Sequence, residues 1–202
     1  MKSSKRKILL DMAMRRGKPG AGSLLSEMRE DNGTYSPRLE LPPLDDLRYV
    51  VVGGLAAALY MPPRATLDVD ILISAADLHE AENLLTKAGC RRLGVLSIGG
   101  SAWSLPGGRT LDMLALDQLW VEDALAAPVQ GPDGIPFIKL PYLILMKLES
   151  GRLQDLADIS RMLGCAGAKQ IEAVRSTVAR FRSQDVEDLE SMLKLGKMEH
   201  ED

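Results

Sequence analysis

The residues of this sequence best suited to chemistry are three aspartates, Asp68, Asp70 and Asp112. The first two lie within residues 64–73, an alternating stretch rich in β-branched residues, so we predict a strand there. Successive side chains of a strand point to opposite faces, so Asp68 and Asp70 share one face. Neighbouring carboxylates repel each other, and a divalent cation such as Mg²⁺, which takes oxygen ligands, relieves that repulsion. Alternatively, this face is open to water and both acids are simply solvated.

Asp112 lies in a second predicted strand, residues 109–115, which follows a turn at residues 106–108. An acid in the middle of an otherwise apolar strand needs a partner or a function. If this strand pairs beside the one that holds Asp68 and Asp70, the three carboxylates converge. Such a set can hold two metal ions, the arrangement that serves phosphoryl and nucleotidyl transfer.

Two glycines, Gly53 and Gly54, separate a predicted strand at residues 48–52 from a predicted helix at residues 55–60, which ends at Pro62. Glycines let the backbone approach a ligand closely, and the N–H groups at a helix N-terminus attract phosphate. Since the pair comes a few residues before the candidate metal strand, it is a candidate phosphate-binding turn. Any tight strand-to-helix turn also favours glycine.

Apolar residues at helical spacing predict a helix at residues 141–150, on which Lys147 borders the apolar stripe. By itself this pattern favours a surface lysine that keeps its charge in water. In the next predicted helix, Asp155 suits the first turn through the helix dipole, and Asp158 is expected to face solvent. Arg152 either binds phosphate or pairs with Asp155.

The glycine pair, then Asp68-x-Asp70, then Asp112 resemble the nucleotidyltransferase superfamily with the DNA polymerase β-like core. The closest likeness is to AbiEii-type toxins and minimal nucleotidyltransferases, whose lysine-bearing helix and R-x-x-D-L-x-D turn resemble residues 140–159. The likeness covers residues 45–165. It implies an α/β (α+β) fold, with a small mixed β-sheet flanked by helices and followed by C-terminal helices.

The resemblance also implies roles for individual residues. Asp68, Asp70 and Asp112 would hold Mg²⁺ or Mn²⁺, Asp112 would help to deprotonate the acceptor hydroxyl, Lys147 would contact phosphate, and Asp155 would support Lys147 or the substrate. Many active members have Gly-Ser in place of the glycine pair, so a serine contact to phosphate is not expected. Arg64 and Thr66, just before the metal strand, suit a phosphate contact or a turn equally. The nucleotide-binding candidates are Gly53, Gly54, Arg64, Thr66, Lys147, Arg152 and Asp155.

The expected function is metal-dependent transfer of a nucleoside monophosphate from a nucleoside triphosphate to an RNA end, such as that of tRNA, or to a protein hydroxyl. The resemblance suggests a toxin–antitoxin or defence component with a cognate partner. One alternative is a non-catalytic nucleotide- or RNA-binding module, or an antitoxin-like protein, on the same fold. Another is a nucleotidyltransferase that acts on a small molecule. No nucleobase-reading element is identified.

Composition bounds these interpretations. The 202 residues are 46% hydrophobic, enough for one real core, and only 4% aromatic, which argues against a protein that binds single strands by base stacking. The net charge is −3, yet residues 1–20 hold seven Lys or Arg and one Asp, so a basic arm precedes an acidic body. That arm either touches nucleic acid or is a solvated tail. We expect a basic, loosely ordered extension at residues 1–43, a core at 44–165, and helices with an acidic tail at 166–202.

Other function classes are disfavoured. The cysteines Cys90 and Cys165 lie far apart, and with only His79 and His200 they exclude an ordinary zinc site and make histidine-dependent hydrolysis an unattractive option. No signal peptide or membrane span is expected, and a reducing, cytoplasmic setting fits. The remaining predicted elements are a helix at 75–88, a hairpin at 92–105, a helix at 120–126, an extended segment at 129–138, and helices at 168–181 and 184–195.

Overall fold

A mixed sheet of seven strands organises the protein, for which the computed structural model describes residues 41–44, 47–63, 68–131 and 134–200. The strand order is β3-β4-β5-β2-β1-β7-β6. β1 pairs antiparallel with β2 and parallel with β7, whereas β2 and β5 run parallel to each other. The predicted mixed sheet is therefore confirmed. The strands are β1 (Val50–Val51), β2 (Val69–Ser74), β3 (Arg91–Val95), β4 (Ser101–Ser104), β5 (Thr110–Leu116), β6 (Val129–Gln130) and β7 (Pro136–Phe137).

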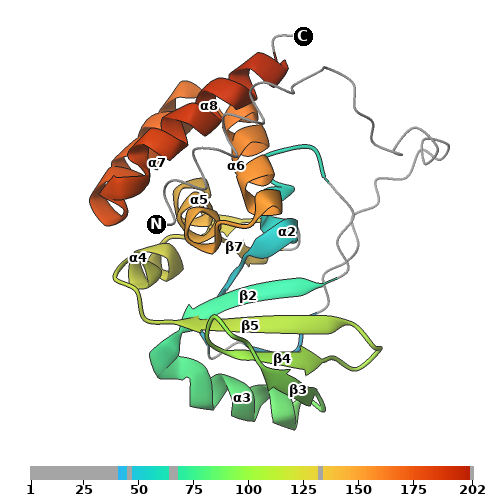
Figure 1. Cartoon of the computed structure of the whole chain (residues 1–202). Helices are drawn as coiled ribbons and strands as arrows, with labels where there is room; N and C mark the ends of the chain where they lie inside the picture. The colour runs from blue at the N-terminus through green and yellow to red at the C-terminus, as the bar shows by residue number, and fades with distance from the viewer. Residues whose placement is uncertain (1–40, 45–46, 64–67, 132–133, 201–202) are drawn as a thin grey trace, which may run out of the picture.

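Helices flank the sheet on two sides. In Figure 1, α3 lies along the half of the sheet that contains β3, β4 and β5, while α5 to α8 gather at the opposite end of the molecule. α6 packs along α8, and α5 packs along α7. None of the helices in the described residues is long and apolar enough to cross a membrane. The helices are α2 (Gly53–Ala57), α3 (Leu78–Lys87), α4 (Trp120–Ala126), α5 (Leu140–Ser150), α6 (Leu153–Cys165), α7 (Ala168–Phe181) and α8 (Val186–His200).

The parallel pair β2 and β5 forms the centre of the sheet. In β2, the side chains of Ile71, Leu72 and Ile73 are fully buried, as expected of a strand that is covered on both faces. The register places Asp70 directly opposite Asp112. The two acids therefore lie side by side, next to the point where the buried core begins.

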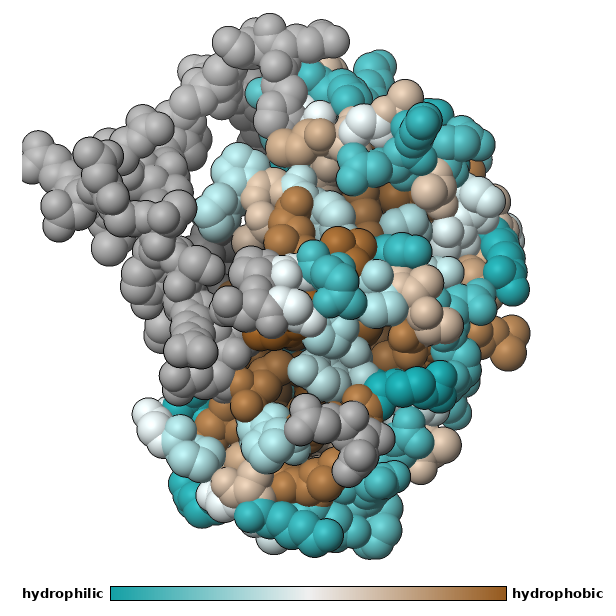
Figure 2. Space-filling view, turned by 180° about the vertical axis from the view of Figure 1, so that it is seen from behind, coloured by the Kyte–Doolittle hydropathy of each residue, from teal (hydrophilic) through white to brown (hydrophobic). Residues whose placement is uncertain are grey.

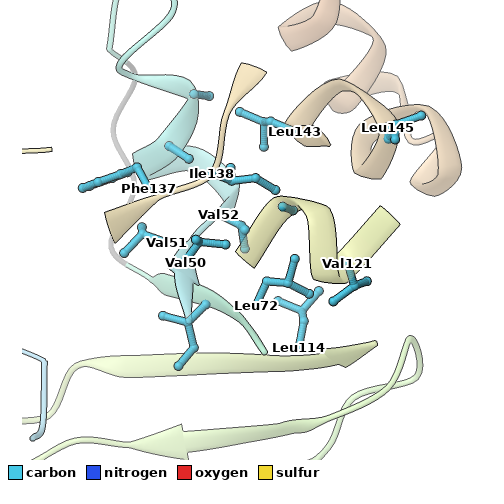
Figure 3. Packing of buried hydrophobic residues seen from close by; sticks show 14 of the residues in the cluster. Val50, Val51, Val52, Leu72, Leu114, Val121, Phe137, Ile138, Leu143 and Leu145 are labelled. Atoms are coloured by element: carbon cyan, nitrogen blue, oxygen red, sulfur yellow. The ribbon is translucent and has the colours of Figure 1, made fainter. Parts of the chain in front are cut away.

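Buried side chains from the sheet, α4 and α5 meet in one core (Figure 3). Leu72 and Leu114 belong to it, and each follows an acid by two residues on the same strand face. The core thus continues directly from the acids and holds α5 near them. The labelled core residues are Val50, Val51, Val52, Leu72, Leu114, Val121, Phe137, Ile138, Leu143 and Leu145.

Most predicted elements are confirmed, with changes at their ends. The predicted helix at 120–126 is α4, the predicted hairpin is β3 and β4, and the helix predicted at 75–88 begins with a 3-10 turn before α3. The helix predicted at 55–60 instead begins at Gly53 and ends at Ala57 as α2. Tighter turns follow it, with Leu59 N–H donating to Ala56 O, ahead of the proline pair that cannot continue a helix.

Another difference lies near the C-terminus, and parts of two predicted segments lie outside the described residues. α8 extends to His200 instead of residue 195. The first described residue of the predicted strand at 64–73 is Asp68, and β2 begins at Val69, so the earlier part lies outside the described residues. Residues 1–40 of the predicted extension lie outside them too. On the surface, hydrophobic side chains show in separate patches among hydrophilic ones (Figure 2).

Candidate active site

Asp68, Asp70 and Asp112 line one cavity of about 350 Å³. Asp70 is the second residue of β2 and Asp112 is the third residue of β5, and the parallel register sets them opposite each other. Asp68 lies two residues before Asp70, just outside the strand, and is exposed, whereas Asp70 and Asp112 are half-buried. The predicted convergence of the three acids on one cavity is therefore found. The solvated alternative fits the exposure of Asp68 better than that of the other two.

The charges of Asp70 and Asp112 are poorly compensated. Burial raises the pKa of Asp70, and the charges of Asp112 and Asp68 raise it further, although Lys147 and Arg152 oppose part of the rise. Burial also raises the pKa of Asp112, with a second contribution from Asp68. Keeping these carboxylates ionised therefore costs free energy, and an added cation would relieve that cost.

The glycine pair forms the wall next to Asp70. Gly53 has a φ of 65°, a conformation that favours glycine, and a Cβ placed there would lie 1.8 Å from Oδ2 of Asp70. The N–H of Val52 donates to the carbonyl oxygen of Asp70 at 2.9 Å. Gly53 is therefore needed so that the turn can pack directly against the carboxylate. Since α2 has only five residues, any phosphate binding here would depend on the N–H groups of the turn more than on a helix dipole.

Lys147 is buried beside the acids and lines the same cavity. Its Nζ donates to Oδ1 of Asp155 at 2.8 Å and to Oδ2 of Asp158 at 2.7 Å. The interpretation of Lys147 as a surface lysine is therefore wrong, because packing of α5 against α6 covers it. The expectation that Asp158 faces solvent is also wrong, because this side chain is 0% exposed and also accepts a hydrogen bond from Gln154.

Further hydrogen bonds complete this lysine cluster, which consists of Lys147, Ser150, Arg152, Asp155 and Asp158. Nε of Arg152 donates to Oδ2 of Asp155 at 2.7 Å, and the hydroxyl of Ser150 donates to the same oxygen. Burial alone would raise the pKa of Asp155, but hydrogen bonds from Lys147, Ser150 and Arg152 outweigh it and lower the pKa. Of the two roles predicted for Arg152, the ion pair with Asp155 is found, and the exposed Arg152 also borders the cavity.

The donor set can be compared with what a divalent cation requires. In the described part of the chain, no three His, Cys, Asp or Glu side chains lie close enough together to form a complete metal site. Mg²⁺, however, is commonly held by one or two carboxylates, water and substrate phosphates, without an all-protein cage. The adjacent carboxylates of Asp70 and Asp112, with Asp68 nearby, are oxygen donors of the type that Mg²⁺ and Mn²⁺ accept. The residues present therefore fit such a cation.

An apolar wall of the cavity was missed from the sequence. Leu96 and Ile98, from the loop between β3 and β4, line it together with Leu114, Leu143 and Met146. Ile98 is 63% exposed, so most of its side chain also faces solvent. The sequence held one signal for this wall, since Leu96 and Ile98 come just before Gly99 and Gly100 at a predicted hairpin turn.

Two predicted site residues cannot be placed, since Arg64 and Thr66 lie outside the described residues. Gly54 and Arg152 line the cavity with the other predicted residues. A second cavity, of about 380 Å³, lies between residues 58–62 and α6. Its described lining includes no charged side chain, so the candidate site is assigned to the first cavity.

Comparisons with known proteins give only distant similarities. No family model matches the chain, and no curated protein matches it. Among solved structures, it is similar to the antibiotic-resistance factor ANT(2'')-Ia, with 19% identity over 78% of this chain and 88% of that one, and a TM-score of 0.42. It is also similar to the lincosamide antibiotic adenylyltransferase LnuA, with 16% identity over 60% of this chain and 89% of that one, and a TM-score of 0.41. A third similarity, to the Megavirus polyadenylate synthase, has 11% identity over 67% of this chain and 31% of that one, with a TM-score of 0.36.

Proposed function

We propose that this protein is a metal-dependent nucleotidyltransferase, which transfers a nucleoside monophosphate from a nucleoside triphosphate to the hydroxyl of an RNA end or of a protein. The observation that supports this most is the meeting of opposite kinds of charge in one cavity. Asp70 and Asp112 lie side by side on one wall, and the buried Lys147 lies on another. Carboxylates that attract a metal ion and a cation that attracts phosphate are the two requirements of this reaction.

The residues of the cavity divide the work. Nζ of Lys147 uses two hydrogen bonds on Asp155 and Asp158, and an ammonium group has three donors, so one remains for a phosphate oxygen. Arg152 supplies a second cation at the cavity rim. The turn at Gly53 has no side chain between its backbone and the acids, so a phosphate can approach closely.

Asp112 would take the proton of the acceptor hydroxyl, because burial raises the pKa of its carboxyl towards the value that suits a general base. The acceptor oxygen then attacks the α-phosphorus and pyrophosphate leaves. A divalent cation such as Mg²⁺ or Mn²⁺, held by Asp68, Asp70 and Asp112, would neutralise the triphosphate and polarise the α-phosphorus. By its resemblance to AbiEii-type proteins, the chain is further proposed to work in the cytoplasm as a toxin–antitoxin or defence component with a cognate partner.

The test is label transfer. Purified protein is incubated with each α-³²P nucleoside triphosphate, Mg²⁺, and total RNA or cell lysate. We expect label in a macromolecule with the natural protein, a loss of at least about 1,000-fold with Asp70→Ala, and an unchanged rate with the exposed Asp117→Ala. Circular dichroism would show that each variant is folded. Transfer at the natural rate by Asp70→Ala would exclude the metal assignment.

A second candidate is a module that binds nucleotide without turning it over. Such a module would use the same cavity and its cations Lys147 and Arg152, and it would need neither a metal ion nor a general base. Equilibrium dialysis against the same labelled triphosphates separates the two candidates. Binding without transfer supports the module, whereas transfer to any acceptor excludes it. Label that appears only in a small molecule would indicate the small-molecule enzyme instead.

A further inference from the structure

The strand order sets the parts of the candidate site in a row across the sheet. Across the sheet, the turn at Gly53 follows β1, Asp70 lies on β2 and Asp112 lies on β5, and these strands are neighbours in that order. The loop between β3 and β4 comes next, because it packs on β5. A Cβ at Gly100 would lie 1.9 Å from the carbonyl oxygen of Met113, and one at Gly99 would lie 2.8 Å from that of Ala115. The glycines thus let the loop press against β5.

The two ends of this row differ in chemistry. Among the described residues that line the cavity, the only cations are Lys147 and Arg152, both from α5 and its junction with α6. The other end has no cation, and there the loop that packs on β5 adds the apolar side chains of Leu96 and Ile98 to the described cavity lining. The triphosphate is drawn to the cationic end, so the acceptor is left with the end formed by Asp112 and the loop.

On the basis of the proposed function, we infer that Leu96 and Ile98 are an acceptor platform, and that the acceptor is a protein that presents a side-chain hydroxyl on an apolar segment. A cavity of about 350 Å³ is near the lower end of the roughly 300–1,000 Å³ that drug-sized ligands occupy. A nucleoside triphosphate would take most of it. The acceptor therefore reaches Asp112 from outside, across the exposed Ile98, as a large molecule would.

Charge favours a protein over an RNA end. Each nucleotide of RNA brings a phosphate, and RNA-binding sites offset that charge with Lys and Arg. The described cavity lining holds Asp68, Asp70 and Asp112, and its two cations lie at the donor end, where both pair with Asp155. The loop between β3 and β4 adds no Lys or Arg to that lining. An uncharged hydroxyl on an apolar segment meets no such repulsion. In the reaction, the hydroxyl oxygen bonds to the α-phosphorus, the bond from that phosphorus to the bridging oxygen breaks, pyrophosphate leaves with the electron pair, and the proton passes to Asp112.

The experiment assigns both the acceptor and the platform. The full chain is incubated with labelled triphosphates, Mg²⁺ and cell lysate, and the products are divided for treatment with protease, treatment with RNase, and filtration to collect small molecules. We expect label that protease removes and RNase does not. Label that RNase removes, or that passes the filter, would overturn the inference while leaving nucleotidyl transfer established. Binding of triphosphate without label in any fraction would refute the proposed function and this inference with it.

Variants of the hairpin provide the second measurement. Ile98→Asp should lower labelling of protein by about tenfold, since a charge replaces an apolar contact, while the Kd for the triphosphate stays unchanged. Val95→Asp is the matched control, because Val95 is 73% exposed on the same hairpin and does not line the cavity. An equal loss of triphosphate binding in Ile98→Asp would assign the loop to the donor and overturn the inference.

A cation on the same hairpin discriminates further. Arg91 pairs in register with Ser104, two residues from the Ala102 that pairs with Asp112, so it is on the Asp112 face of the sheet. An RNA acceptor could use this exposed arginine, whereas an apolar segment would not. Labelling of protein should be unchanged in Arg91→Ser. A clear loss would favour the RNA acceptor.

Discussion

Two groups of charged side chains share the cavity and differ in how fully their charges are balanced. In the lysine cluster, Lys147 and Arg152 offset Asp155 and Asp158, and hydrogen bonds lower the pKa of Asp155 despite its burial. Among the three site acids, burial and mutual repulsion raise the pKa of Asp70. In the first group each acid has a cationic partner, whereas in the second the repulsion at Asp70 and Asp112 is only partly offset.

The difference assigns a structural role to the lysine cluster and a role in ligand binding and catalysis to the three site acids. A cluster of paired charges stabilises the fold and fixes the lysine, so its loss should appear first in stability. A group of partly offset charges stores repulsion that a bound cation can relieve, so its loss should appear in ligand binding and turnover while the fold gains. Perturbed carboxylates of this second kind are typical of functional sites, although structural ion pairs also shift pKa values. Three variants measure whether this division holds.

The largest stability effect is expected for Lys147→Met. Removal of the cation leaves Asp155 and Asp158 buried beside an apolar side chain, and breaking a buried ion pair from one side costs about 3 kcal/mol or more. For a chain of this size, that is a fall in Tm of roughly 6–12 °C. Thermal unfolding followed by circular dichroism measures it.

The double variant Lys147→Met with Asp158→Asn serves as the control for this effect. The second substitution removes the charge of Asp158, which Lys147 no longer offsets. The double variant should therefore recover part of the lost Tm, and the effects of the two changes should not be additive. The loss in Lys147→Met should also shrink in acid, where the stranded carboxyls are protonated. An unchanged Tm in Lys147→Met would show that the cluster does not stabilise the fold and would remove one side of the comparison.

The two groups also differ in how far the sequence could predict them. Strand alternation placed Asp68 and Asp70 on one face, and a conditional pairing of the two strands brought Asp112 to them. The burial of Lys147 depends on α5 meeting α6, and that of Asp158 depends on helix packing that no local pattern contains. One signal was available: Asp155 and Asp158 are three residues apart, so they share a helix face, and a lysine that binds one can bind both.

The fold was predictable to a similar degree. Hairpin, helix and strand positions followed from glycine turns, prolines and apolar spacing, whereas the place of β1 between β2 and β7 did not, because short strands of two residues give no pairing signal. The contact of Gly53 with Asp70 could not be predicted either, because Gly53 follows β1, whose pairing was not predicted. It joins a turn to a strand that only the tertiary structure brings together.

That contact gives the second prediction, for Gly53→Ala. The new Cβ would lie 1.8 Å from Oδ2 of Asp70, so the carboxylate or the turn must move. A displacement of about 1 Å at a reacting centre can lower turnover by up to about 100-fold, and we expect a loss of kcat of about 10- to 100-fold. Label transfer under saturating triphosphate measures it.

Gly89→Ala is the matched control, because Gly89 also has a positive φ, 80°, but nothing lies within 4 Å of a Cβ placed there. Backbone strain should cost both variants a similar free energy of unfolding, on the order of 1 kcal/mol, and Gly53→Ala adds the cost of moving Asp70 or the turn. Only Gly53→Ala should lose turnover. Equal losses of turnover in both variants would show that strain, and not the position of Asp70, is responsible.

The smallest effect is the most direct test of the difference in charge balance. The pKa of Asp70 is raised in the folded state, so the folded chain binds this proton more tightly than the unfolded chain does, and ionisation destabilises the fold as pH rises through the raised pKa. Without divalent metal, Asp70→Asn should therefore be more stable than the natural protein at neutral pH. The gain should be on the order of 1 kcal/mol, or roughly 2–4 °C in Tm, and should vanish as pH falls towards the ordinary carboxyl range.

Asp155→Asn should show the opposite sign, because the lowered pKa of Asp155 stabilises the fold at neutral pH and loses that contribution in acid. Mg²⁺ should raise the Tm of the natural protein and leave that of Asp70→Asn unchanged. A lower Tm for Asp70→Asn at neutral pH would mean that the site acids are already balanced, and that the two groups do not differ in the way their pKa shifts indicate.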